Sequence, residues 1–301
     1  RQLAPAEVQE RVYRVQRMSG RLRLPDRLIR ILRSAEQGDS ASFPPTEIFN
    51  EGWMLRLVLD AVQSLEMRSH PLAFEPGARW YSEALLESPF RASRRGDPLA
   101  EGFTNADAVI GHFEFRPSTK AGLTLSPGGA QFVVTEAKMF SNLSAGTRNA
   151  RDFNQAARNV ACMAWALAQS GRSIADFGSL GFHVIAPEIS RRGAGISNIE
   201  TSMDPGRIRE AVSARIAAYG SLDEARHAML REWEAGIFEP FLDHLARVGG
   251  LGVLSWESCI TDIEKVDAEA GHEIAAFYER CLTYSSSTPQ IDRAPVVEPE
   301  A

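Results

Sequence analysis

Three charged side chains, Asp107, Glu136 and Lys138, fall on two stretches that have the composition of β-strands. β-Branched and apolar residues dominate residues 105–115 and 131–138. Side chains of a strand alternate between its two faces, so Glu136 and Lys138 point the same way. The sequence thus predicts a carboxylate and an ammonium group together at the end of an apolar strand.

The position of Asp107 relative to Glu136 depends on the turn between the two strands. If the chain turns near residues 120–123, paired positions sum to a constant and Asp107 lies opposite Glu136. A turn at residues 126–129, which read Ser-Pro-Gly-Gly, would break this register. With the first turn, we expect two carboxylates to face each other.

Two facing carboxylates repel each other unless a hard cation lies between them, and oxygen ligands of this kind suit Mg²⁺. A bound Mg²⁺ keeps several waters, polarises a phosphoryl oxygen and neutralises developing charge. A lysine beside the metal can orient or deprotonate the attacking water. This set of side chains therefore indicates phosphodiester hydrolysis.

A Glu-x-Lys triplet also arises by chance on a solvated strand or helix face. This chain, however, has only three lysines, at positions 120, 138 and 265. One of the three lies two residues after a glutamate, at the end of an apolar strand that follows an Asp-led strand. We therefore favour a site over a solvated face.

These residues resemble the motif of the PD-(D/E)xK nuclease superfamily, with Asp107 as its first acid and Glu136-Ala137-Lys138 as its ExK strand. The proline of the family name is absent, since Asn105 and Ala106 precede the aspartate. The separation between Asp107 and Glu136 is long and implies an inserted hairpin. The resemblance covers about residues 46–190.

The resemblance implies an α/β fold with a restriction-endonuclease-like αβββαβ core, in which helices flank a mixed sheet. An N-terminal helical arm and a C-terminal α/β elaboration would be added to that core. Helical spacing and strand composition give the corresponding elements. The expected helices are 46–66, 148–169, 205–219, 222–248 and 260–282, and the expected strands are 79–86, 105–115, 131–138, 180–187 and 251–256.

The resemblance also implies roles for individual residues. Asp107, Glu136 and the carbonyl of Ala137 would hold Mg²⁺, for which Mn²⁺ can substitute. Lys138 would position the attacking water. A helix glutamate often joins such a site, and Glu51 is expected there with Glu47 as the alternative. Gln155 resembles a glutamine that several branches place on the following helix, although a polar helix face needs no such role.

The domain organisation expected from composition has three parts, namely a basic helical arm (1–40), the nuclease-like domain with its elaboration (41–282) and a disordered tail (283–301). Residues 1–34 carry nine arginines against three acids, whereas the whole chain has a net charge of −6. This arm can bind a phosphate backbone or dock on a protein partner or a second copy, and arginines in water explain it equally well.

Three widely spaced cysteines match no zinc pattern and indicate buried thiols in a reducing compartment. No membrane span or signal-like start is apparent, so we expect a cytoplasmic protein.

The expected function is metal-dependent cleavage of nucleic acid by a DNA endonuclease, and a restriction, repair or phage-defence setting suits such a protein. The alternative is a catalytically silent or partner-dependent binding module that retains the fold. Mild acidity favours that alternative, because free-standing nucleases usually show more basic surface.

Overall fold

The computed structural model describes residues 24–35, 42–92, 94–117, 119–146, 149–188 and 199–285. The chain separates into two compact units, residues 1–49 and 50–301. In the first unit, helix α2 (Leu24–Ser34) lies within the expected helical arm, and a short 3₁₀ helix, η2, spans Pro45–Glu47. The first part of the arm and most of the expected tail lie outside the described residues.

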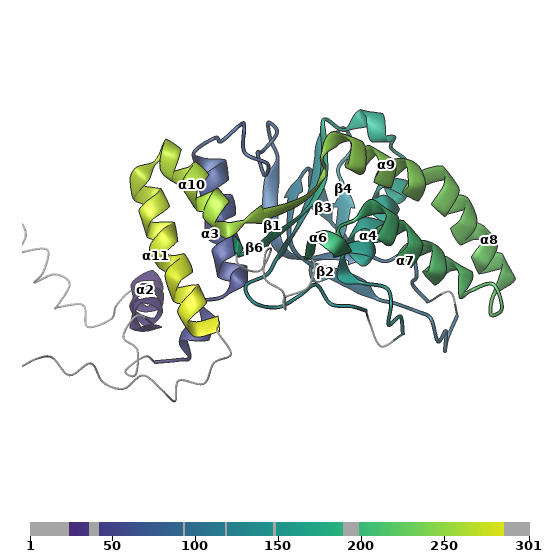
Figure 1. Cartoon of the computed structure of the whole chain (residues 1–301), viewed down its shortest axis with the longest axis horizontal. Helices are drawn as coiled ribbons and strands as arrows, with labels where there is room; N and C mark the ends of the chain where they lie inside the picture. Colours follow the sequence, from purple (N-terminus) through teal and green to yellow (C-terminus); the bar gives the residue numbers. More distant parts are fainter. Residues whose placement is uncertain are drawn as a thin grey trace, which may run out of the picture. The chain divides into compact units, whose positions relative to one another are not determined.

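The second unit is built on a five-stranded mixed sheet, as predicted (Figure 1). Its strand order is β1-β2-β5-β6-β7. Strands β1 (Arg79–Glu87), β2 (Phe103–Gly111) and β5 (Gln131–Ala137) pair antiparallel. Strands β6 (Ser179–Ala186) and β7 (Leu251–Ser255) pair parallel to β5 and to each other. Strand β5 is buried along its whole length, which explains the apolar run at residues 132–134.

The predicted register between β2 and β5 is confirmed. Ala108 pairs with Thr135 and Val109 with Val134, so the next position outward sets Asp107 opposite Glu136. The connection is longer than a simple hairpin, because β3 (Phe113–Phe115) and β4 (Leu123–Leu125) form a separate two-stranded sheet within it. This is the inserted hairpin that the long separation predicted.

A glycine separates β2 from β3, which the sequence predicted as one strand. Gly111 has φ +146°, and a Cβ atom there would come within 2.1 Å of the carbonyl oxygen of Gln131. The chain therefore bends at a position that only glycine fits. His112 Nδ1 then accepts a hydrogen bond from the backbone N–H of Ala130 at 3.2 Å and fixes the bend.

Helices cover both faces of the sheet. Helix α4 (Gln155–Ser170) packs on β1 and β2, and it is buried further by α7 (Pro205–Ala217). Helix α3 (Glu51–Ser64) contacts β1, β2 and β5 and packs against α10 (Trp256–Val266) and α11 (Ala268–Ser285). In Figure 1, α4 and α7 lie on one side of the strands and α3, α10 and α11 on the other.

The remaining helices complete the α4 side. A 3₁₀ turn, η3 (Ile174–Asp176), leads into β6, and the short α6 (Ile199–Ser202) precedes α7. Helix α8 (Glu224–Trp233), a π-helical stretch η4 (Glu234–Phe238) and α9 (Glu239–Val248) follow as one continuous run, close to the predicted 222–248.

Three predicted helix boundaries were wrong. Helix α3 begins at Glu51, because Asn50 and not Thr46 caps it by accepting from the N–H of Trp53 at 3.0 Å. Helix α4 begins at Gln155, because the side chain of Asn154 caps it. The expected helix 260–282 is two helices, since Asp267 adopts an extended conformation between α10 and α11.

All three cysteines are free thiols buried in this unit, as predicted. Burial raises the pKa of each thiol to about 12, so they are poor nucleophiles. Within the described ranges, no helix is long and apolar enough to cross a membrane.

Candidate active site

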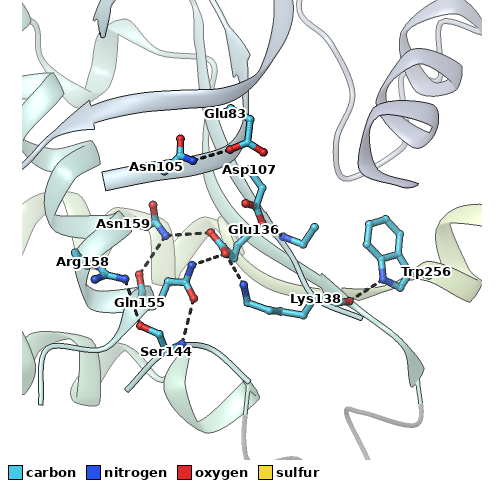
Figure 2. A network of polar contacts seen from close by, with 11 residues as sticks. Glu83, Asn105, Asp107, Glu136, Lys138, Ser144, Gln155, Arg158, Asn159 and Trp256 are labelled. Atoms are coloured by element: carbon cyan, nitrogen blue, oxygen red, sulfur yellow. Dashed lines mark hydrogen bonds and ion pairs between the residues drawn. The ribbon is translucent and has the colours of Figure 1, made fainter. Parts of the chain in front are cut away.

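Asp107 and Glu136 lie next to the last recorded pair of the β2–β5 ladder, Ala108 with Thr135 (Figure 2). The Glu136 side chain is only 1% exposed at the end of β5. The Asp107 carboxylate turns toward β5, where its Oδ2 accepts a hydrogen bond from the backbone N–H of Ala137 at 2.8 Å. Two acids from neighbouring strands are thereby held side by side.

The environment of this pair disfavours negative charge. Burial, and then the charge of Asp107, raises the pKa of Glu136 from 4.5 to about 8. Burial also raises the pKa of Asp107, although the N–H of Ala137 and the Lys138 ammonium oppose the shift. The side chains of the protein therefore do not neutralise both carboxylates, and a bound cation would supply the missing positive charge.

Lys138 is the one cation in direct contact with this pair among the described residues. Its Nζ lies 2.6 Å from Oε1 of Glu136, and its side chain is 11% exposed. The backbone of Lys138 is anchored on both sides. Its N–H donates to the carbonyl of Ile185 at 2.8 Å, and its carbonyl accepts from the indole Nε1–H of Trp256 at 2.9 Å. The ammonium group is thus presented from a fixed backbone.

Trp256 offers a test of that anchoring. It is fully buried, so Trp256→Phe would leave the carbonyl of Lys138 without its donor. We expect a loss of about 1–3 kcal/mol in the free energy of unfolding, measured by urea denaturation. Trp233→Phe is the matched control, because Trp233 is 5% exposed and its indole N–H has no partner in the described part of the chain. Equal destabilisation by the two changes would refute this role.

Helix α4 supplies two amides to Glu136. Gln155 donates from Nε2 to Oε1 of Glu136, and its own Oε1 accepts from the N–H of Ser144 at 3.1 Å. The structure thus places Gln155 beside the predicted acid. Asn159, which is fully buried, lies one turn further, with Nδ2 3.5 Å from Oε2 of Glu136 and an Oδ1 that has no hydrogen-bond partner in the described part.

Glu83 occupies the position opposite Asp107 in the β1–β2 ladder, so its charge adds to the site. Its carboxylate accepts from Nδ2 of Asn105 at 2.6 Å and lies 3.9 Å from the guanidinium of Arg56. Its φ of +59° is left-handed, which is strained for a residue with a side chain. Backbone strain of this kind often marks a functional position.

The strain at Glu83 predicts an unusual order of stabilities. Glu83→Gly and Glu83→Ala remove the same carboxylate contacts, but only glycine relieves the left-handed backbone. We expect the glycine variant to be more stable than the alanine variant by about 1 kcal/mol in chemical denaturation. An alanine variant as stable as the glycine variant would show that the backbone there is unstrained.

Two other predicted ligands are placed differently. Glu51 begins α3, and its charge acts on Cys281 of α11. In the described ranges it has no contact with Asp107, Glu136 or Lys138. Its alternative, Glu47, belongs to the other compact unit. For Ala137, the structure records a role for the amide, which donates to Asp107.

A divalent cation fits the centre through two carboxylates and water. Asp107 and Glu136 can both donate oxygen atoms, and a bound cation would stabilise the charged carboxylates that burial disfavours in both cases and that the charge of Asp107 disfavours further at Glu136. Within the described residues, no three Asp, Glu, His or Cys side chains converge as a metal group. Two carboxylates are sufficient for Mg²⁺, since it commonly binds through one or two carboxylates and keeps several waters.

Sequence reasoning found the two acids, the lysine and Gln155, but missed other members of the site. Asn159 follows Gln155 at i+4 spacing on the same polar face of the predicted helix, but only Gln155 was assigned to the site. Trp256 lies far along the chain and carries no local signal.

Compared with known proteins, the chain matches no family model, no curated protein and no solved structure.

Proposed function

We propose that this chain is a Mg²⁺-dependent phosphodiesterase that cleaves DNA, built on a restriction-endonuclease-like core. The observation that carries the proposal is the buried Asp107–Glu136 pair with the Lys138 ammonium 2.6 Å from Glu136. Along the chain, apart from β3, β4 and the short η3, the helices and strands follow the order α3-β1-β2-β5-α4-β6, which supports the restriction-endonuclease-like fold.

In this proposal Asp107 and Glu136 bind the metal. When bound, Mg²⁺ polarises the phosphoryl oxygen and activates a water. Lys138 holds the attacking water and stabilises negative charge that develops on the phosphate oxygens. Gln155 and Asn159 fix the rotamer of Glu136 through their amides, so the carboxylate does not reorganise during reaction.

A second candidate is a binding module that keeps the fold without cutting, or a subunit that needs a partner protein. Two observations favour this second candidate. The chain has a net charge of −6, and no third acidic, histidine or cysteine side chain joins Asp107 and Glu136 in the described residues. The basic arm would then contribute to nucleic-acid binding or to assembly. Deleting residues 1–40 separates these roles, because loss of DNA binding indicates a DNA arm and loss of assembly a protein-binding arm.

The test is cleavage of supercoiled plasmid, single-stranded circular DNA and RNA with Mg²⁺, Mn²⁺ or EDTA. We expect metal-dependent cutting of DNA that Asp107→Asn abolishes. Asp60→Asn, at an exposed position of α3, is the control and should cut like the parent protein. An unaltered protein that cuts none of these substrates with either metal would refute the proposal.

A further inference from the structure

A cavity of about 740 Å³ adjoins the candidate active site. It is lined by the loop before β2, the first residues of β2, and the N-terminal half of α4. Gln155 lines this cavity and also donates a hydrogen bond to the Glu136 carboxylate. Asn105, two residues from Asp107 on β2, lines it as well. A molecule bound at the two acids can therefore extend into this cavity without leaving the protein surface.

The loop that forms one wall is held in place by a buried arginine. Arg215 of α7 is 5% exposed and donates to the carbonyls of Asn149, at 3.1 Å, and Leu99. It also forms an ion pair with Glu101 at 3.8 Å, so the acid on this wall is offset by a cation. Asn149 in turn donates to the carbonyl of Ala100 at 2.9 Å. These contacts indicate a preformed cavity, which binds a ligand without first ordering a loop.

Arg158 gives the cavity a site for an anion. Its guanidinium forms no ion pair within the described residues, and its one hydrogen-bond partner there is the hydroxyl of Ser144 at 3.4 Å (Figure 2). Its Nε is buried and has no acceptor in that same part of the chain. An unpaired, partly buried guanidinium is well suited to a phosphate, which it can bind through two parallel hydrogen bonds. Arg158 lies three residues after Gln155, roughly 4.5 Å along the helix axis.

Phe103 gives the same cavity an aromatic surface. It is the first residue of β2, its exposed fraction is 37%, and the guanidinium of Arg91 lies 5.3 Å from its ring centre. Phe103 and Arg158 line the same cavity, and proteins bind unpaired bases by combining a solvent-accessible ring with positive charge along the backbone. A base within a duplex is stacked and paired, and it enters such a cavity only at an unpairing cost of a few kcal/mol.

We propose that this cavity binds one unpaired nucleotide next to the phosphate held at Asp107 and Glu136, with Arg158 on its phosphate and Phe103 stacked on its base. The inference rests on the proposed function and narrows its substrate class to single-stranded DNA, or to DNA with an unpaired nucleotide at the cleavage position.

The test measures binding separately from cleavage. A fluorescent oligothymidylate and a duplex of equal length are titrated with protein in Ca²⁺, and fluorescence anisotropy is recorded. We expect tighter binding of the single strand. Phe103→Ala should weaken that binding roughly 5- to 150-fold, as loss of one stacked base does, whereas Phe103→Trp should retain it. Arg158→Gln should reduce the magnitude of the slope of log affinity against log salt by about 0.7, the value for one phosphate contact to a single strand.

Matched controls are available on other surfaces. Phe115 on β3 is 39% exposed and Arg207 on α7 is exposed, and neither lines the cavity. Phe115→Ala and Arg207→Gln should therefore leave binding of the single strand unchanged. Equal affinity for the two DNAs, or a loss with Phe103→Ala no larger than with Phe115→Ala, would overturn the inference.

The outcomes also distinguish this inference from the proposed function. If plasmid is cut in a metal-dependent way but Phe103→Ala changes neither binding nor strand preference, the nucleotide-binding cavity is refuted and the nuclease activity is supported. If the protein cuts nothing but binds the single strand through Phe103, the nucleotide-binding cavity is supported and the nuclease activity is refuted. If no nucleic acid binds, both proposals are refuted.

Discussion

Replacing Lys138 with alanine is expected to lower the rate of DNA cleavage by a factor of about 10³ while the protein stays folded. The Lys138 ammonium is the cation nearest to Glu136 in the described structure, at 2.6 Å. Its loss removes both the group that positions the attacking water and a fixed positive charge at the phosphate. Single-turnover cleavage at saturating protein measures this effect without a contribution from substrate binding.

The chain provides unusually direct controls for this change, since Lys120 and Lys265 are its only other lysines. Lys265 is exposed and pairs with Asp262 at 2.8 Å. Lys120→Ala and Lys265→Ala should therefore cut at the parental rate. Lys138→Arg keeps the charge but replaces a compact ammonium with a planar guanidinium, and we expect it to be nearly as inactive as the alanine variant. Cleavage by Lys138→Ala at the rate of the Lys265 control would contradict the assigned role.

Replacing Glu136 with glutamine is expected to abolish cleavage and, in the absence of metal, to stabilise the fold. The pKa of Glu136 rises from 4.5 in the unfolded chain to about 8 in the folded one. Between these values the folded protein keeps a proton that the unfolded chain releases, so stability falls as pH rises from about 4.5 to about 8. Above pH 8 the folded protein bears the full cost of ionising the buried Glu136 carboxyl. The size of the pKa shift sets an upper limit of roughly 5 kcal/mol on this loss of unfolding free energy.

The gain on substitution should be smaller than that ceiling, because glutamine leaves Lys138 without its carboxylate partner. We expect a difference of a few kcal/mol in the free energy of unfolding at pH 8.5, and a difference near zero at pH 4.5, in urea denaturation with EDTA. Asp60→Asn, at an exposed position of α3, is the control for the substitution itself. A Glu136→Gln variant less stable than the parent at pH 8.5 without metal would contradict this interpretation.

The sequence was most informative about the strands and their register. The buried strand β5 and the Asp-led strand β2 were visible as apolar runs, and the constant sum of paired positions placed Asp107 opposite Glu136. These strands and the helices between them depend on side-chain periodicity, which one sequence displays directly. The mixed sheet was expected from the family resemblance, and the structure has such a sheet.

The features that escaped prediction depend on backbone conformation or on distant contacts. The left-handed φ of Glu83 has no signature in a strand-like sequence, and neither has the extended conformation of Asp267 that separates α10 from α11. Trp256 reaches Lys138 across 118 positions of the chain. The cavity beside Gln155 depends on the long-range contacts of Arg215, which likewise leave no local pattern.

All the chemistry proposed for this protein depends on a divalent cation bound by Asp107 and Glu136. The most direct test is a calorimetric titration of Mn²⁺ at pH 8.5, where the Glu136 carboxyl is no longer mainly protonated in the metal-free protein. We predict saturable binding that Glu136→Gln abolishes and that Glu232→Gln, an exposed change on α8, retains. An unaltered protein without saturable binding, or a Glu136→Gln variant that binds Mn²⁺ as tightly as the parent, would contradict the account.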